Sequence, residues 1–341
     1  MNTVIDAHAH FLPRGALRAA GTGEIWHGLR IEVAENSAVA VTRPPANPKT
    51  DAERVFRRIP AYFQTPEQRI IAMRAAGIDM QIISMSPALF RYDLDSAAAV
   101  AFAREINDDL HAMSAEWPDN FRGFGSLPMQ DVGASVAELE RCVRDLGLLG
   151  VIVDTHVNGV DWDSPILFPV LEAAEALGAV VFIHPGMQRV AKLWPRYHLR
   201  NLIGNPLETT VAVASLIFGG VLDRLPQSKM FFAHAGGFSC ANVGRFDHGH
   251  EVRQETRGGA AELPSEYLKH LYFDTITHNE LALRNVVDVA GISQVVLGTD
   301  FPADMGEDRP VEWIMSCGSL TAAEKDAILH SNAHPFLKTR I

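Results

Sequence analysis

The sequence predicts an α/β chain folded as a (β/α)8 TIM barrel with a small insertion after the first strand. Short β-rich runs alternate with helical patterns along the chain, which is typical of repeated βαβ units around a parallel sheet. Several of these runs are nearly continuous Val, Ile, Leu or Phe, as in strands that are buried on both faces. The runs number eight, as the barrel requires, and they cover residues 3–6, 79–84, 121–126, 150–154, 179–183, 229–233, 270–274 and 294–298.

Length and composition agree with this fold. A chain of 341 residues is long for one average domain and short for three, so it suits two domains or one large barrel with insertions. Hydrophobic residues make up 47% of the chain and charged residues 21%, which provides a sizeable core and excludes a disordered or fibrous protein. We therefore expect residues 1–341 to form a single barrel domain.

One segment, residues 14–60, fits no βα unit. It contains Pro44, Pro45 and Pro48, which interrupt regular structure. Because it follows the carboxyl end of the first predicted strand, we predict a small insertion folded over the barrel mouth.

The helices between the strands have recognisable starts and apolar faces. Thr65 is an N-cap, Pro66 suits the first helical position, Gln68 completes a capping box, and Gly77 can end that helix. Apolar residues at spacings of three and four then indicate two core-facing helices. They are Val100, Ala103, Ile106, Leu110 and Met113 in the first, and Val136, Leu139, Val143 and Leu146 in the second.

Charge and cysteine content narrow the possible partners and compartments. With 30 basic and 41 acidic residues the net charge is −11, which disfavours nucleic acid and anionic membranes as partners. The three cysteines show no CxxC spacing, which favours a reducing compartment. The amino terminus lacks the pattern of a secretory signal, and the most apolar stretch, residues 211–222, is too short to span a bilayer. We expect a cytoplasmic protein.

Histidine, the commonest metal ligand in proteins, occurs 14 times. His8 and His10 form an HxH directly after the first predicted strand, His184 and His234 follow strands five and six, and Asp300 follows strand eight. All five lie at carboxyl ends of strands, where such barrels build active sites. One buried histidine alone is more often a core residue, but the conjunction favours a metal site. The two HxH rings point the same way, so with His184 and Asp300 they suit one Zn²⁺ with a position left for water.

Seven motifs spread over nearly the whole chain resemble the amidohydrolase superfamily. Within it they are most similar to the non-oxidative decarboxylases of the 2-amino-3-carboxymuconate-6-semialdehyde decarboxylase-like branch. The motifs are IDAHAHFLP at 5–13, GFGSLPMQ at 123–130, GVIVDTHVN at 150–158, GNPLETT at 204–210, FFAHAGG at 231–237, VGRFDHGH at 243–250 and LGTDFP at 297–302. This resemblance implies a single divalent metal, usually zinc, held by His8, His10, His184 and Asp300, with His234 beside the metal-bound water as acid/base.

The resemblance also implies a reaction. We expect a zinc-dependent carboxy-lyase that releases CO₂ from an aromatic or muconate-type carboxylic acid by means of a metal-activated water and His234. Either hydroxide adds to the conjugated system, or His234 helps to protonate the carbon that bears the carboxylate. The alternative is a metal-dependent hydrolase or hydratase of a small carboxylated substrate on the same site. A catalytically silent binding protein is a third class, but its ligand set would normally be broken, and here it is complete.

Arginines suit the substrate carboxylate because the planar guanidinium matches it bidentately. By resemblance, Arg57 corresponds to a carboxylate-binding arginine of the insertion, with Arg58 beside it as a rival. Arg245 corresponds to an arginine that the family donates across a dimer interface, so we expect a homodimer with Arg245 reaching the neighbouring site. His156, near the end of strand four, is either a substrate contact or an outer hydrogen-bond partner.

Two departures from relatives refine this expectation. Superfamily members with two ions bridge them through a modified lysine at the end of strand four, and residues 151–156 contain no lysine, which favours a single ion. After the His-Pro that ends strand five, the similar decarboxylase has an aromatic residue where this chain has Gly186. The loss of that wall should enlarge or reshape the pocket and leaves the relative's own substrate in doubt.

Overall fold

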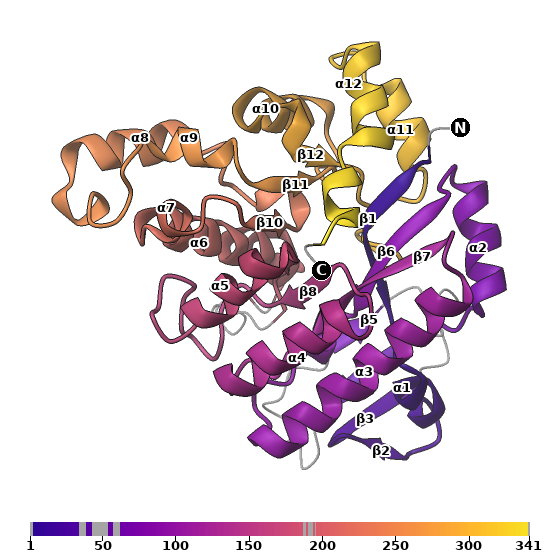
Figure 1. Ribbon diagram of the computed structural model, residues 1–341. Coiled ribbons are helices and arrows are strands. Elements are labelled where there is room, and N and C mark those ends of the chain that lie inside the picture. Colours follow the sequence, from indigo (N-terminus) through magenta and orange to yellow (C-terminus); the bar gives the residue numbers. More distant parts are fainter. Residues whose placement is uncertain are drawn as a thin grey trace.

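The structure, a computed structural model, describes residues 3–33, 39–42, 54–56, 62–186, 189, 194 and 196–339. Eight parallel strands form one sheet in the order β1-β6-β7-β8-β9-β10-β11-β12, which confirms the predicted barrel (Figure 1). Each strand overlaps one predicted run. Their bounds are β1 Ile5–Phe11, β6 Met80–Met85, β7 Phe121–Ser126, β8 Gly150–Val153, β9 Val180–Ile183, β10 Lys229–Phe232, β11 Tyr272–Asp274 and β12 Val295–Val296.

The first strand and the segment that starts with β12 meet through backbone hydrogen bonds. Ala7 N donates to Leu297 O at 2.8 Å, and His10 N donates to Phe301 O at 2.7 Å. These bonds bring the last strand of the sheet against the first. One expectation was wrong, because β1 runs to Phe11 and the HxH lies inside this strand rather than after it.

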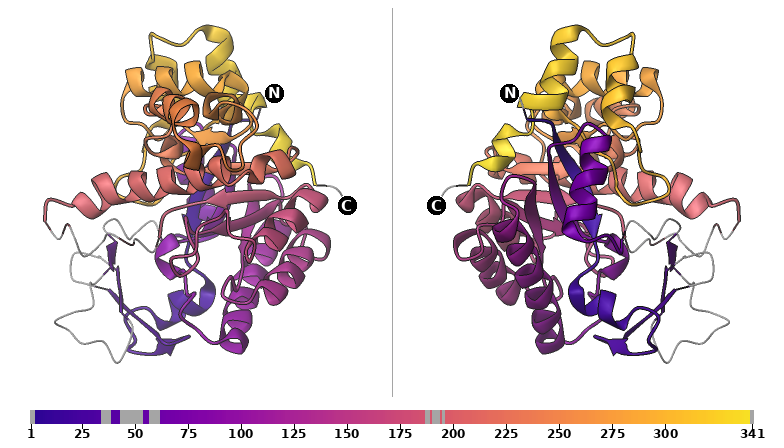
Figure 2. Two further views of the ribbon diagram at one scale, coloured as in Figure 1. Left: turned by 90° about the vertical axis from the view of Figure 1, so that its left-hand side faces the viewer. Right: turned by 90° about the vertical axis from the view of Figure 1, so that its right-hand side faces the viewer.

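Helices surround the barrel on its outer side (Figures 1 and 2). The capping box at Thr65 is present: its side chain accepts from Gln68 N, and the Gln68 side chain accepts from Thr65 N. The predicted apolar face of α3 is buried at Ala103, Ile106 and Leu110. The helices are α1 Arg14–Ala19, α2 Pro66–Ala75, α3 Ser96–Glu116, α4 Val132–Arg144, α5 Phe168–Leu177, α6 Asn205–Phe218, α7 Val221–Arg224, α8 Val243–Val252, α9 Pro264–Leu268, α10 Glu280–Ala290, α11 Pro310–Ser316 and α12 Ala322–Asp326.

The segment after β1 forms a second, four-stranded antiparallel sheet. Its strands are β2 Ile25–Trp26, β3 Leu29–Val33, β4 Val39–Thr42 and β5 Arg54–Phe56. Helix α3 anchors it, because Trp26 Nε1 donates to Glu105 at 2.9 Å and His27 Nε2 lies 2.8 Å from the same carboxylate. The small sheet lies at the end of the barrel toward which β1 runs (Figure 2). Much of the predicted insertion lies outside the described residues, so its covering of the mouth stays a prediction.

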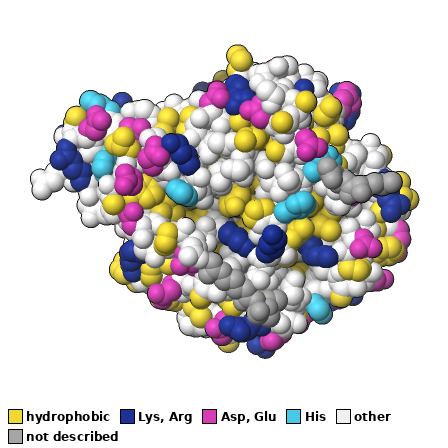
Figure 3. Space-filling view, turned by 45° about the horizontal axis from the view of Figure 1, so that its top comes forward, with side chains coloured by type: hydrophobic (Ala, Val, Ile, Leu, Met, Phe, Trp, Pro, Cys, Tyr) yellow, Lys and Arg dark blue, Asp and Glu magenta, His cyan; other side chains and the backbone are white. Residues whose placement is uncertain are grey.

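On the face drawn in Figure 3, acidic side chains lie mostly toward the edges, and several Lys and Arg side chains lie close together near the centre. In the part of the chain that the structure describes, no helix has the length and apolar composition needed to cross a bilayer. The thiols of Cys142, Cys240 and Cys317 are free and buried, as expected for small core residues.

Candidate metal centre

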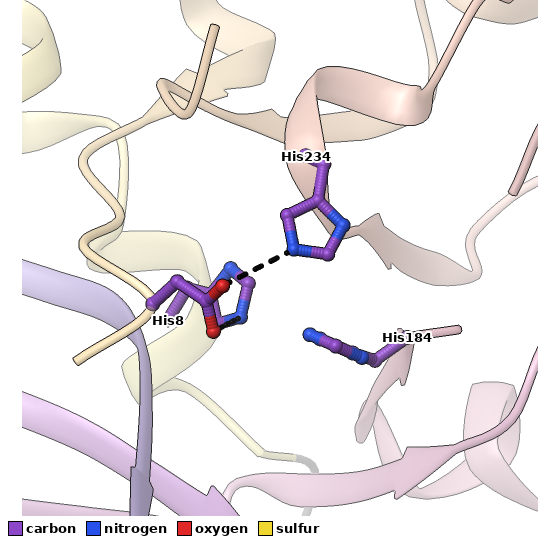
Figure 4. Close-up of side chains that lie close together, drawn as sticks. His8, His184 and His234 are labelled. Carbon is purple, nitrogen blue, oxygen red and sulfur yellow. Dashed lines mark hydrogen bonds and ion pairs between the residues drawn. The ribbon is translucent and has the colours of Figure 1, made fainter. Parts of the chain in front are cut away.

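The five predicted side chains meet at one end of the barrel. His8 and His10 come from β1, His184 follows β9, His234 follows β10 and Asp300 follows β12. Strand periodicity places His8 and His10 on the same side of β1. Figure 4 shows the rings of His8, His184 and His234 converging beside a carboxylate. Four of the five residues are buried, and the side chain of His234 keeps 16% of its surface exposed.

The distances within this cluster are those of groups that share one cation. One atom each from His8, His184, His234 and Asp300 all lie within 4.8 Å of one another. The Nε2 atoms of His8 and His10 are 3.0 Å apart, and Asp300 Oδ1 lies 3.1 Å from His10 Nε2. His234 Nε2 lies 3.4 Å from the other oxygen of Asp300.

The outer ring nitrogens of three histidines are fixed by hydrogen bonds. His8 Nδ1 lies 2.7 Å from Asp274 Oδ2, and His184 Nδ1 lies 3.0 Å from the carbonyl oxygen of Pro185. These oxygens only accept, so we assign the proton of each ring to Nδ1. His10 Nδ1 has a hydroxyl partner, Ser84 Oγ, at 3.1 Å. The Nε2 lone pairs are thereby directed into the cluster, as in metal-binding histidines.

The residues fit a bound cation. His184 Nε2 is buried and has no hydrogen-bond partner among the described residues, which is costly for an isolated acceptor. Burial disfavours a charged His8, yet Asp274 and Asp300 outweigh burial and raise its pKa to about 10. Burial lowers the pKa of His10 to about 4 and that of His184 well below its ordinary value. Most imidazoles of the site are thus neutral, while the two carboxylates favour a positive charge between them. A bound divalent ion supplies that charge.

Asp274, at the end of β11, is a functional residue that the sequence argument missed. It accepts hydrogen bonds from the backbone N–H of His234 at 2.7 Å and of Ala235 at 2.8 Å, in addition to its contact with His8. Those two residues have positive φ angles of 54° and 53°, so the carboxylate holds an unusual backbone turn. The signal was available, because Asp274 ends the seventh predicted strand.

A second buried carboxylate, Asp6, holds the backbone next to the cluster in place. Its Oδ1 accepts from His8 N and Thr299 N, each at 3.1 Å, and its Oδ2 accepts from Gln81 Nε2 at 2.8 Å. Arg69 from α2 donates to the carbonyl oxygen of His10 at 2.8 Å. This network joins β1, β6 and the end of the last strand, and it sets the backbone that carries the HxH.

A pocket opens over the cluster, with a cavity volume of about 140 Å³. Its walls combine the metal-site residues with polar side chains from the loops at this end of the barrel. The lining residues are His10, Tyr62, Ser86, Pro87, Ala88, His184, Pro185, Gly186, His198, Arg200, Asn201, Asn205, His234, Asp300, Ala303 and Asp304.

The predicted substrate contacts are placed differently. His156 is buried in the loop after β8, where its Nδ1 accepts from Gly159 N at 3.1 Å, and it does not line the pocket. Arg245 is exposed on α8 and does not line the pocket of its own chain. Arg57 and its rival Arg58 lie outside the described residues.

Gly186, where we expect the pocket to be enlarged or reshaped, has close neighbours. A Cβ atom on Gly186 would lie 2.4 Å from Phe90 Cδ2 and 2.8 Å from Pro87 O. The space beside this glycine is therefore filled by Phe90, from the loop after β6. The expectation that the pocket is enlarged or reshaped here stays a prediction.

Comparison with known proteins agrees with the geometry of the site. Residues 5–339 match the Amidohydrolase family. The chain belongs to this family. Over 337 residues it is 36% identical to a 2-amino-3-carboxymuconate-6-semialdehyde decarboxylase of Dictyostelium discoideum, covering 98% of this chain and 91% of that protein. This relationship confirms the predicted branch of the superfamily.

Two further similarities extend the comparison. This amidohydrolase is 27% identical over 292 residues to a gamma-resorcylate decarboxylase of Polaromonas sp. strain JS666, covering 80% of this chain and 87% of the relative. The solved dihydroxybenzoic acid decarboxylase from Polaromonas sp. JS666, with bound manganese and the inhibitor 2-nitroresorcinol, has a TM-score of 0.79 at 22% identity and covers 99% of this chain and 97% of that one. At that identity the likeness shows a shared fold.

Proposed function

We propose that this amidohydrolase is a metal-dependent non-oxidative decarboxylase, a carboxy-lyase that releases CO₂ from an aromatic or muconate-type carboxylic acid. The observation that carries the proposal is the cluster of histidines and Asp300 at the floor of a pocket of about 140 Å³. A cavity of about 150 Å³ can hold a benzene ring, so the pocket suits a substrate with one ring or a chain of similar size. The relatives named above are decarboxylases of such acids.

In this proposal His8, His10, His184 and Asp300 hold one ion per chain. Zinc suits three imidazoles and a carboxylate, and the manganese bound by the Polaromonas protein makes Mn²⁺ the ion to compare with it. When bound, a divalent ion supplies Lewis acidity and activates water.

We assign His234 the acid/base role although its Nε2 also faces the cluster. Metal-binding histidines almost always donate their other N–H to an acceptor, whereas His234 Nδ1 has no hydrogen-bond partner in the described part of the chain. Its side chain is also more exposed, at 16%, than that of Asp300, at 9%. It lines the pocket, so a proton on Nε2 faces the place where substrate binds.

The chemical step then follows from the residues. The bond between the ring or chain carbon and the carboxylate breaks, its electron pair stays on that carbon, and CO₂ leaves. A proton from His234 Nε2 forms the new C–H bond, and Asp300 Oδ2, 3.4 Å from that nitrogen, stabilises the protonated imidazole beforehand. Atoms and charge balance without an oxidant or reductant.

The proposal includes a homodimer in which Arg245 reaches the neighbouring pocket and Arg57 binds substrate from its own chain. Helix α8 projects from the barrel and buries no residue in the single chain (Figures 1 and 2). The side chain of Val252 at its end is 58% exposed. A partner subunit would cover this helix. In this proposal His156 makes no substrate contact and serves its own loop as a hydrogen-bond acceptor.

The test incubates the pure protein, loaded with Zn²⁺ or Mn²⁺, with hydroxybenzoic acids and carboxymuconate semialdehydes. Release of CO₂ and a product 44 mass units lighter, as loss of CO₂ requires, would support the decarboxylase. Parallel assays with esters, lactones and amides address the hydrolase alternative. Metal-dependent hydrolysis without CO₂ release from any acid would overturn the proposal.

A further inference from the structure

One wall of the pocket comes from a π-helical turn, η2 (Arg200–Gly204), and the first residue of α6. It contributes Arg200, Asn201 and Asn205 to the lining. A π-helical turn closes with hydrogen bonds five residues apart, which places Arg200 and Asn205 on the same side of the chain. Such turns are frequent at functional sites. This wall, formed by Arg200, Asn201 and Asn205, plays no part in the chemistry described so far.

Arg200 differs from the other shielded arginines of the described chain. Six arginines there are buried or half-buried. Five of them donate hydrogen bonds to carboxylates, amides or carbonyl oxygens, and Arg200 has no such partner within the described ranges. The five are Arg69, Arg91, Arg122, Arg141 and Arg284.

The guanidinium of Arg200 therefore loses hydration without gaining a partner from the described residues. Burial lowers the pKa of Arg200, and no carboxylate of the described residues offsets that effect. Asp304 also lines the pocket, but no ion pair joins it to Arg200 among the described residues. A half-buried charge of this kind is costly unless a ligand pairs with it. The missing partner is an anion that enters the pocket.

We propose that Arg200, assisted by the side-chain amide of Asn201, binds a second carboxylate of the substrate, one that remains in the product. The inference rests on the proposed function and narrows its substrate class to dicarboxylic acids. The carboxylate that leaves must lie at His234, while a carboxylate elsewhere on the same ring or chain reaches Arg200. The planar guanidinium pairs bidentately with a carboxylate, and the amide N–H adds a further donor.

The test measures binding to the metal-loaded protein by calorimetry, with benzene-1,3-dicarboxylate and benzoate as probes. Both probes offer one carboxylate to the metal centre, so the ratio of their affinities isolates the second carboxylate. We expect wild type to bind the dicarboxylate about 10- to 100-fold more tightly, as hydrogen bonds to charged groups allow. Arg200→Met should remove this preference, because it should lower the affinity for the dicarboxylate much more than the affinity for benzoate. Arg200→Lys should retain part of it, because it keeps the charge without the fork.

Arg196→Met is the matched control. Arg196 is exposed, lies in the same segment and does not line the pocket, so the preference should persist. Without ligand, Arg200→Met should melt at or above the wild-type temperature, since Arg200 has no partner among the described residues to lose and its half-buried charge is costly. A wild-type ratio near one, or a full preference in Arg200→Met, would overturn the inference. If the Arg200-dependent preference is present but no acid releases CO₂, the proposed function fails and the carboxylate site stands.

Discussion

His8 Nδ1 lies 2.7 Å from Asp274 Oδ2, and the same carboxylate accepts the backbone N–H groups of His234 and Ala235. One buried residue that is not among the proposed ligands therefore orients a proposed metal ligand and the proposed acid/base together. His8 can present its Nε2 lone pair to the ion only while Nδ1 keeps its proton, and Asp274 ensures this.

Asp274→Asn should weaken metal binding by about 10- to 100-fold, the usual effect of losing such an outer partner. The amide has nearly the same size, but its nitrogen cannot accept a hydrogen bond from His8 or from the backbone. Competition with a chromophoric chelator measures the dissociation constant. Asp79→Asn is the control, because Asp79 accepts from Val4 N at the opposite end of β1. Equal affinities in Asp274→Asn and wild type would contradict this role.

Chelation should abolish activity, and Zn²⁺ or Mn²⁺ should restore it, because no other group in the pocket supplies electrophilic catalysis among the described residues. The ion binds the folded chain and not the unfolded one, so its removal should also lower the melting temperature. Elemental analysis should give one ion per chain. Two ions per chain, or full turnover after verified stripping, would be incompatible with the single centre.

His234→Ala should retain about one ion per chain while turnover falls by about 10²- to 10⁴-fold, the usual contribution of a general acid/base. His10→Ala is the matched comparison and should lose the ion, because His10 is a proposed ligand. Metal content and turnover are measured on the same preparations. Loss of the ion from His234→Ala with retention in His10→Ala would exchange the two roles.

Most of the eight strands could be predicted because a strand that is buried on both faces reads as a nearly continuous apolar run. The same reasoning located His184 and Asp300, since polar residues at the carboxyl ends of parallel strands meet at one edge. The same reasoning ended β1 too early. Asp6, His8 and His10 alternate with apolar residues along this strand, so β1 does not read as a continuous apolar run.

Other features depend on partners that a linear pattern does not show. The burial of Phe90 against Gly186 joins two loops nearly 100 residues apart. Arg200 lies in a turn without periodicity, and its significance comes from the absence of a partner among the described residues. The small sheet near β1 was missed as well, because its contacts lie on α3.

Glu105→Gln should reduce the free energy of unfolding by about 1 kcal/mol at pH 7, the typical value of a side-chain hydrogen bond. Burial alone would raise the pKa of Glu105, but hydrogen bonds from His27 and Trp26 outweigh burial and hold it below the ordinary 4.5. A lowered carboxyl pKa stabilises the folded state above the unfolded pKa, and this contribution is lost as pH falls through the folded pKa.

The difference between wild type and Glu105→Gln should therefore shrink when urea unfolding is repeated below pH 4.5. Glu116→Gln, exposed at the end of the same helix, is the control and should leave stability unchanged at both pH values. A difference that stays constant with pH would assign the effect to packing rather than to the ionised carboxylate.

Arg245 is exposed on α8 and absent from the pocket of its own chain, so its proposed role requires a neighbour. Arg245→Ala and His234→Ala should each lose activity alone and regain part of it when mixed. In a heterodimer of the two variants, one pocket keeps its own His234 and receives Arg245 from the partner subunit. Turnover of the mixture, compared with the two separate samples, measures the recovery.

Subunit exchange must be demonstrated with two affinity tags, so that heterodimers are known to be present. If Arg245 acted within its own chain, each pocket of a heterodimer would still lack one group and mixing would recover nothing. When equal amounts of the two variants exchange subunits at random, half of all dimers contain one subunit of each variant. Each of these heterodimers has one complete pocket and one incomplete pocket. If each pocket acts independently, the maximum activity of the mixture is therefore about a quarter of wild-type activity. No recovery with proven exchange would remove the shared site and leave the metal centre intact.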